Sequence, residues 1–131
     1  MGTLRPSETR KDATSLTSTD QARRIASLCE EKLASDVTIL DMRSVCDYTD
    51  FFVLATGKNP RQTKAIADEV ASVVKQKDRL VPRSIVGLPE ATWIVADYLD
   101  VVLHVFTPET RAFYRLEDLW NDVPKLAAAA V

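Results

Sequence analysis

Glycine, histidine and cysteine are scarce in this chain of 131 residues. Its three glycines, Gly2, Gly57 and Gly87, cannot form the glycine-rich loops that hold the phosphates of ATP or of a dinucleotide. One histidine and two scattered cysteines do not supply the ligands of a structural zinc site, and they form no disulfide framework. These absences argue against an ATPase, a nicotinamide-dependent enzyme and a zinc module, and they favour a reducing compartment.

The chain also lacks an excess of basic charge and a long apolar run. Its formal net charge is −2, so any contact with nucleic acid is expected to be local. No window is apolar enough to span a bilayer, and residues 1–17 lack the apolar core of a signal peptide. We therefore expect a cytoplasmic protein with a disordered leader at 1–17, one domain at 18–124 and a flexible tail at 125–131.

Hydrophobic periodicity predicts alternating helices and strands. Ser18 and Gln21 have the spacing of a capping box, and the helix that follows carries Cys29 on its apolar stripe. Asn59 and Pro60 suit the start of a second helix, and a last helix is predicted at 109–120. Strands are predicted at 37–42, 51–56, 84–86, 93–96 and 101–106, with a hairpin turn at 97–100. This order predicts a single α/β domain built on one mixed, five-stranded sheet.

The run at 51–56, FFVLAT, has no polar alternation, which is typical of a strand covered on both faces. It is expected to lie at the centre of the sheet. The predicted core consists of residues 51–54 together with Ile66, Val70, Ile94, Val101, Leu103 and Val105.

Three carboxylates, Asp41, Asp47 and Asp50, flank the first two predicted strands. Converging carboxylates hold the divalent metals of nucleotide-transfer enzymes, but the same residue types also serve in turns and caps. The spacing does not show convergence. We therefore assign no metal site and no catalytic residue, and keep a metal-dependent nucleotidyltransferase as an alternative.

The last third of the chain gathers aromatic residues, two arginines and His104, the one histidine. His104 is expected on the strand face opposite Val101, Leu103 and Val105, either as a hydrogen-bonded sheet residue or as part of a binding surface; a dyad with Cys46 is a further alternative. Aromatic residues and Arg are enriched at interface hot spots. We expect about half of Trp93, Phe106, Phe113 and Trp120 instead to pack the last helix on the sheet.

Two blocks of sequence resemble the ribosomal silencing factor family, also called the Iojap-like proteins. The first, at 36–70, reads DVTILDMRSVCDYTDFFVLATGKNPRQTKAIADEV, and the second, at 93–120, reads WIVADYLDVVLHVFTPETRAFYRLEDLW. Their length and order make the resemblance specific. The family usually has glycine where this chain has Leu99, so the hairpin turn is expected to differ in shape, because Leu resists a positive φ.

The resemblance implies a fold similar to that of nucleotidyltransferases without their activity or any cofactor. It further implies a translational repressor that binds the large ribosomal subunit through a protein of the L-fourteen type and sterically blocks joining of the small subunit. Organellar relatives act in large-subunit assembly, so an assembly factor or scaffold is a second alternative, and many members form homodimers.

On this basis we expect a partner-binding set in the last third of the chain: Trp93, Asp97, Tyr98, Asp100, His104, Phe106, Glu109, Arg111 and Tyr114. Five acidic residues, Asp97, Asp100, Glu109, Glu117 and Asp118, are expected to complement basic side chains of the partner. Lys58, Arg61 and Lys64 near the second helix start are candidates for contact with ribosomal RNA, against a plain solvated helix face.

Overall fold

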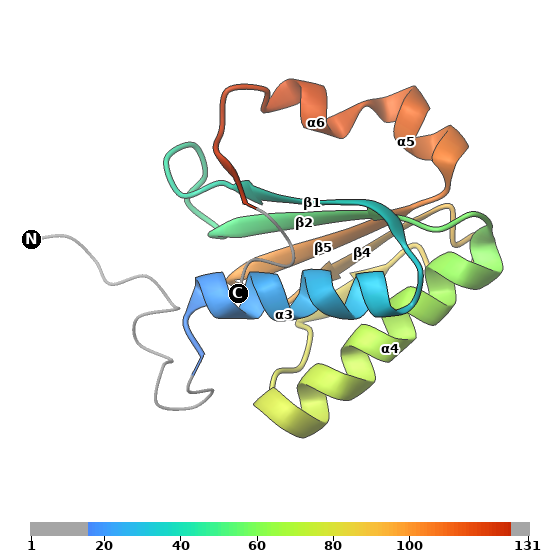
Figure 1. Ribbon diagram of the computed structural model, residues 1–131, viewed down its shortest axis with the longest axis horizontal. Helices are drawn as coiled ribbons and strands as arrows, with labels where there is room; N and C mark the ends of the chain where they lie inside the picture. The colour runs from blue at the N-terminus through green and yellow to red at the C-terminus, as the bar shows by residue number, and fades with distance from the viewer. Residues whose placement is uncertain (1–15, 127–131) are drawn as a thin grey trace, which may run out of the picture.

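A computed structural model describes residues 16–126 of the chain, with elements labelled as in Figure 1. The elements in chain order are α3 (Ser18–Glu31), β1 (Ser35–Asp41), β2 (Phe51–Thr56), α4 (Pro60–Asp78), β3 (Ser84–Val86), β4 (Trp93–Asp97), β5 (Val101–Phe106), α5 (Pro108–Tyr114), α6 (Leu116–Leu119) and β6 (Lys125–Leu126). The strands form one sheet in the order β3-β4-β5-β2-β1-β6. Helices α3 and α4 lie on one face of this sheet, and α5 and α6 lie on the other (Figure 1). The predicted single α/β domain with a mixed sheet is confirmed, with six strands instead of five.

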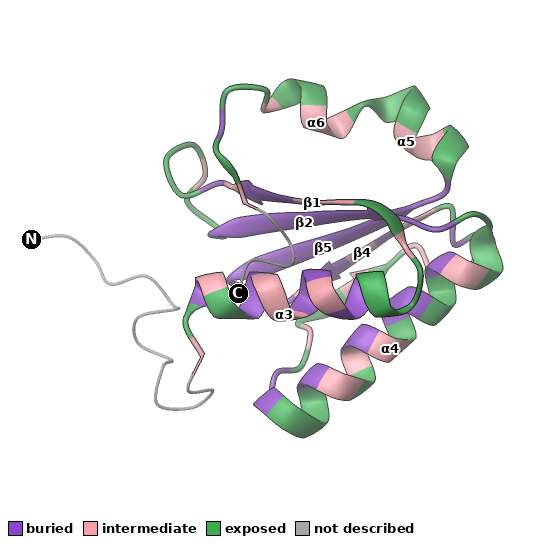
Figure 2. Ribbon diagram, in the orientation of Figure 1, coloured by how far each residue is buried: buried purple, intermediate pink, exposed green. Residues whose placement is uncertain are grey.

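The centre of the sheet is the parallel pair β2 and β5, whose register runs from Phe51 opposite Val101 to Thr56 opposite Phe106. All six residues of each strand are buried, and Figure 2 shows both strands as buried. Residues pointing to one side pack against α3 and α4, while those on the other side form a second, smaller cluster that includes Leu40, Phe52 and Phe106. The expectation that the strand at 51–56 is covered on both faces is therefore confirmed, and every predicted core residue is buried.

Side-chain caps fix the starts of the two long helices. The N-cap of α3 is Thr17, whose hydroxyl accepts a hydrogen bond from the Asp20 backbone N–H at 3.1 Å. The predicted capping box of Ser18 and Gln21 is wrong, because Ser18 is already helical and the Gln21 amide donates to the Leu16 carbonyl at 3.4 Å. The start of α4 is as predicted, with Asn59 as N-cap and Pro60 in the first turn.

The C-terminal part differs from the sequence prediction in two places. The helix expected at 109–120 is interrupted at Arg115, which has a left-handed backbone with φ of 50° and separates α5 from α6. Lys125 and Leu126, expected in the tail, pair with β1 as a sixth strand, and Leu126 packs against the main core. A strand of two residues is too short to give a periodic signal. Residues 1–15 of the expected leader and 127–131 of the expected tail lie outside the described residues.

Tyr98, which we expected at the partner surface, lies in the core at 1% exposure. It continues the alternation of Ile94 and Ala96, which point toward α3 and α4, and it belongs to the same cluster as Cys29. Burial raises the pKa of Tyr98, and its hydroxyl has no hydrogen-bond partner among the described residues. The next residue, Leu99, adopts the positive φ, 78°, that a glycine would take without strain.

Truncating Tyr98 should therefore act on stability. Tyr98→Ala is expected to lower the free energy of unfolding by about 3–5 kcal/mol, because it leaves a large cavity in the core. Tyr98→Phe, which removes only an unpaired hydroxyl, should stay within about 1 kcal/mol of the parent protein. Urea denaturation monitored by circular dichroism measures both. Equal stability of the alanine variant and the parent would contradict the core position of this ring.

Candidate functional site

A continuous series of ring contacts crosses the sheet face on which α5 and α6 lie. From the surface inward, Phe113 contacts Tyr114 at a centroid distance of 4.9 Å, Tyr114 contacts Trp93 at 4.8 Å, and Trp93 contacts Phe106 at 5.2 Å. His104 stacks beside Phe106 at 6.0 Å. The series continues through Phe52, which lies 4.8 Å from His104 and 5.3 Å from Trp120. We call these seven residues the aromatic face.

Strand register explains how the aromatic face forms. Trp93 of β4 is the direct partner of Phe106 of β5, and His104 pairs with Val95 on β4 and with Leu54 on β2. Because side chains alternate along a strand, His104 and Phe106 point to the same side, opposite Leu103 and Val105. The predicted orientation of His104 is therefore confirmed: its ring contacts Phe52 and Phe106, which belong to one core cluster, while Leu103 and Val105 belong to the other.

Within the aromatic face, side-chain exposure increases from Phe106 outward to Phe113. Phe52 and Phe106 are buried and Trp93 and Trp120 are partly buried, whereas Tyr114 is 53% exposed and Phe113 is 77% exposed. Phe106, Trp93 and Trp120 thus pack the sheet, as expected for part of this group, and Phe113 does not. Trp93, Tyr114 and Phe113 form the accessible end, which we call the aromatic patch.

His104 is a hydrogen-bonded residue beneath this patch. The indole Nε1–H of Trp93 donates to His104 Nδ1 at 3.1 Å, and the imidazole is only 7% exposed. Burial lowers the pKa of His104 to about 4, so the ring is neutral at physiological pH. Within residues 16–126, Cys46 makes no hydrogen bond to His104. It lies beside Tyr48 instead, whose pKa is raised first by burial and then by Cys46. The structure does not assemble the Cys46–His104 dyad.

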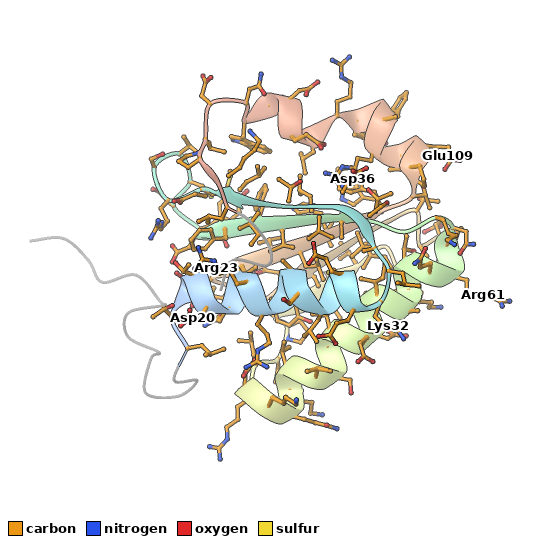
Figure 3. All side chains as sticks on the ribbon, in the orientation of Figure 1. Asp20, Arg23, Lys32, Asp36, Arg61 and Glu109 are labelled. Atoms are coloured by element: carbon orange, nitrogen blue, oxygen red, sulfur yellow. The ribbon has the colours of Figure 1, made fainter. Side chains whose placement is uncertain are left out.

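Arg111, expected at the partner surface, holds α5 and α6 against the sheet. Its Nε and Nη2 donate to the Glu117 carboxylate at 3.1 and 2.8 Å. Its Nη1 donates to the Thr56 hydroxyl at 2.8 Å and to the Asp36 carbonyl at 2.8 Å, and Figure 3 shows Asp36 beneath α5. Thr56 and Asp36 were not predicted from the sequence, because no local pattern links either of them to Arg111, which is far away in the chain. With its side chain only 10% exposed, Arg111 is not available as a contact residue.

The five acidic residues expected to face a partner are mostly occupied within the protein. Asp97 pairs with Arg83 at 3.0 Å, Glu117 with Arg111 at 2.8 Å, and Asp118 with Arg115 at 2.7 Å. Asp100 is buried. Of the five, Glu109 alone is exposed and makes no ion pair with another described residue, and Figure 3 shows it at the start of α5. The expected acidic surface is therefore reduced, because arginines of the same chain neutralise it.

The basic residues Lys58, Arg61 and Lys64 are exposed at the start of α4, and Figure 3 shows Arg61 extending away from the helix. They lie near the aromatic patch because β2 and β5 are parallel and end at the same edge of the sheet. The Gly57 N–H, just after β2, donates to the Phe106 carbonyl at the end of β5 at 2.8 Å. The structure thus brings the basic residues and the start of α5 to one edge.

The three carboxylates considered for metal binding do not assemble. Both oxygens of Asp41 accept from the Arg43 guanidinium, at 2.9 and 2.7 Å, and this hydrogen bonding lowers the pKa of Asp41. Asp47 is exposed, whereas Asp50 is buried. Across residues 16–126, no group of three or more His, Cys, Asp or Glu side chains has the arrangement of a metal site. No described helix has the length and apolar character needed to cross a membrane.

Fold and surface together define a small α/β domain with an accessible aromatic patch beside α5. A family model described as "Ribosomal silencing factor during starvation" matches residues 15–131. Ribosomal silencing factor RsfS of Bacillus subtilis is 36% identical over 99 residues, which cover 76% of this chain and 83% of that protein. The corresponding protein of Halalkalibacterium halodurans is 35% identical over 78% of this chain and 86% of its own length. The chain belongs to the ribosomal silencing factor family, as its two sequence blocks predicted.

Solved structures and more distant relatives agree with this assignment. A crystal structure of a Chromobacterium violaceum protein, 26% identical, superposes with a TM-score of 0.78 and covers 88% of this chain and 95% of that one. A mouse relative, "Mitochondrial assembly of ribosomal large subunit protein 1", is 32% identical over 74% of this chain but only 43% of its own length. Family membership makes the chain a ribosome-associated regulator of translation, and the relatives' names point to a regulatory or assembly factor instead of an enzyme.

The hydrogen bonds of Arg111 to Glu117, Thr56 and Asp36 should make it sensitive to a change that keeps its charge. Arg111→Lys is expected to lower the free energy of unfolding by about 1–3 kcal/mol, because one ammonium cannot reach Glu117, Thr56 and the Asp36 carbonyl together. Arg115→Lys is the matched control, since its pair with Asp118 lies at the surface and should contribute under about 1 kcal/mol. Denaturant unfolding compares them. Equal effects of the two substitutions would contradict the role given to Arg111.

Proposed function

We propose that this chain docks through its aromatic patch on the L-fourteen-type protein of the large ribosomal subunit. The observation that carries the proposal is the accessible series Trp93, Tyr114 and Phe113, which leaves large rings at the surface of a ribosomal silencing factor. Aromatic residues are enriched at the centres of protein interfaces, where they bury much area at little entropic cost. Trp93 lies in β4, and Tyr114 and Phe113 lie in α5, which Arg111 bonds to the sheet, so little ordering is needed on binding.

Docking at this position blocks joining of the small subunit by occupying surface that both partners need. An interface of ordinary size covers about 800 Å² on each side. If that area overlaps the contact between the subunits, the two partners exclude each other. Affinity and position are sufficient for this repression, so the mechanism uses no catalytic residue and no energy source. The site of action is then the cytoplasm, where ribosomal subunits meet.

The proposed contact set is smaller than the one expected from the sequence. Trp93, Tyr114 and Phe113 form its centre, and Glu109 forms its acidic rim. His104 and Phe106 support Trp93 from beneath. The remaining expected residues, listed by position, act within the protein: Asp97, Tyr98, Asp100 and Arg111. Tyr98 and Asp100 are buried, Asp97 is paired with Arg83, and Arg111 is hydrogen-bonded to residues of α6, β1 and β2.

Ribosomal RNA beside the docking protein is the proposed partner of Lys58, Arg61 and Lys64. These residues are exposed and make no ion pair with another described residue. They also lie at the sheet edge where α5 begins, so a partner on the aromatic patch brings its surroundings close to them. A local basic group of this kind fits a chain whose net charge is −2, since it can neutralise a few phosphates without general affinity for nucleic acid.

Large-subunit assembly is the second candidate function. The name of the mouse relative supports it, because that protein shares 32% of its aligned residues with this chain. Both functions use the same docking step and differ only in whether the bound factor prevents joining. A second copy of this chain is a competing occupant of the aromatic patch, and sedimentation at low protein concentration distinguishes a homodimer from a monomer.

The docking step is tested by truncating the rings of the patch. Trp93→Ala and Tyr114→Ala should each weaken binding to purified large subunits by at least about fivefold, since hot-spot truncations cost about 1 kcal/mol or more. Val81→Ala removes an exposed apolar side chain beyond the end of α4 and should leave binding unchanged. Co-sedimentation gives the affinities.

A subunit-joining assay with the same proteins separates the two candidate functions. Large subunits loaded with the parent chain should form fewer complete ribosomes, and loading with Trp93→Ala should restore joining. Binding without any effect on joining would rule out repression and leave large-subunit assembly as the function. Absence of binding at physiological salt would rule out both functions.

The proposed RNA contact predicts a change in salt dependence. Replacing Arg61 and Lys64 together by Ala should reduce the slope of log affinity against log salt by about 0.7–0.9 for each phosphate that is no longer neutralised. Replacing Lys75 and Lys77, two exposed charges near the other end of α4, is the matched control and should not change the slope. If both pairs change it equally, the effect is one of net charge, and the RNA contact is not supported.

A further inference from the structure

Trp93 is held in one orientation by its neighbours. Its Nε1–H donates to His104 Nδ1 at 3.1 Å, its ring lies 5.2 Å from Phe106, and Tyr114 packs against it at 4.8 Å. The only polar atom of the indole, Nε1, is already hydrogen-bonded inside the protein. Trp93 can therefore contact a partner only through the apolar surface of its ring. A buried tryptophan N–H usually needs a hydrogen-bond partner, and here the chain itself supplies it.

His104 is itself fixed beneath the aromatic face. Its ring is 7% exposed and lies between Phe52, at 4.8 Å, and Phe106, which stacks at 6.0 Å with an interplanar angle of 10°. Nδ1 accepts the indole N–H, so the proton of the neutral ring is on Nε2, which has no hydrogen-bond partner among the described residues.

Packing alone does not require an imidazole at this position. A phenylalanine would fill a similar volume among the same rings and would avoid the cost of a buried, unpartnered N–H. What a hydrocarbon ring lacks is the acceptor at Nδ1. The imidazole therefore lowers stability through its unpartnered Nε2–H, but its Nδ1 fixes the orientation of the Trp93 indole.

We infer that His104 is a positioning residue that turns the Trp93 N–H inward and so presents an apolar indole surface to the docking partner. This inference deepens the proposed docking function and rests on it for the partner. The partner side chain that fits this surface is aliphatic or cationic, because a π-face attracts both, and it is not a hydrogen-bond acceptor seeking an N–H. Without the acceptor, the partly buried Trp93 turns its N–H toward water, and binding must reorder it.

The orientation is tested first in the free protein. His104→Phe keeps the ring and removes the acceptor, whereas His104→Asn retains a side-chain acceptor on the carbon to which Nδ1 is attached. Solvent exchange of the Trp93 indole N–H is followed by NMR, with its signal assigned by its loss in Trp93→Phe. Exchange should be slow in the parent chain, at least about tenfold faster in His104→Phe, and slow again in His104→Asn. Rapid exchange in the parent chain would overturn the inference without any variant.

The consequence for docking is tested on purified large ribosomal subunits. His104→Phe should weaken binding by about three- to tenfold, the effect of one net hydrogen bond, and His104→Asn should stay within about twofold of the parent. In a Trp93→Ala background the same change at His104 should have no effect, since the two residues act as one unit. If His104→Phe does not fold, His104→Leu takes its place.

The outcomes separate this inference from the proposed function. If the parent chain does not bind large subunits, the docking function fails and takes with it the role of Trp93 in docking, while the exchange measurement still decides the orientation. If the parent chain binds but His104→Phe binds equally well, only the positioning role is overturned. A loss of affinity that persists in the Trp93→Ala background indicates a general structural effect and also overturns it.

Discussion

The parallel pairing of β2 with β5 is the constraint on which the rest of the domain depends. Both strands are buried along their whole length, so helices must cover both faces of the sheet. Parallel strands also end at the same edge, which is why α4 and α5 start close together. The bond from the Gly57 N–H to the Phe106 carbonyl joins these two strand ends at 2.8 Å. A basic helix start and an aromatic patch, far apart in sequence, become neighbours for this reason.

The two faces of the sheet are covered in different ways. On one face, α3 and α4 bury aliphatic stripes that include Ile25 and Val70. On the other, α5 and α6 contain no buried residue. They are held by the polar contacts of Arg111 and by a few partly buried contacts, such as that of Leu116 with the second core cluster. Short helices held in this manner leave rings such as Tyr114 accessible, whereas a buried apolar stripe would have covered them. The face that packs less completely is therefore the one suited to a partner.

Sequence reasoning located elements whose signal is local. The apolar runs at 51–56 and 101–106 and the Asn59–Pro60 start of α4 were predicted to the residue, because each carries its own pattern. Tyr98 was wrongly predicted to lie at the surface. Its side chain points to the core because the in-and-out alternation of β4 continues for one residue beyond the strand, into the turn. The acidic surface failed for a different reason: Asp97, Glu117 and Asp118 meet arginines only once the chain is folded. Family resemblance identified the chain as a ribosomal silencing factor but could not say which of its residues are buried.

Neutralisation of the acidic residues changes what holds the proposed complex together. With Asp97 and Glu117 paired internally, long-range attraction to a basic partner is weakened, and such attraction mainly raises association rates. Affinity must then come from short-range burial of rings, which depends on their being correctly oriented beforehand. A hydrogen bond of 3.1 Å between Trp93 and a buried, neutral His104 meets that requirement without adding charge to the surface. The same sheet register that pairs Trp93 with Phe106 places His104 where it can make this bond.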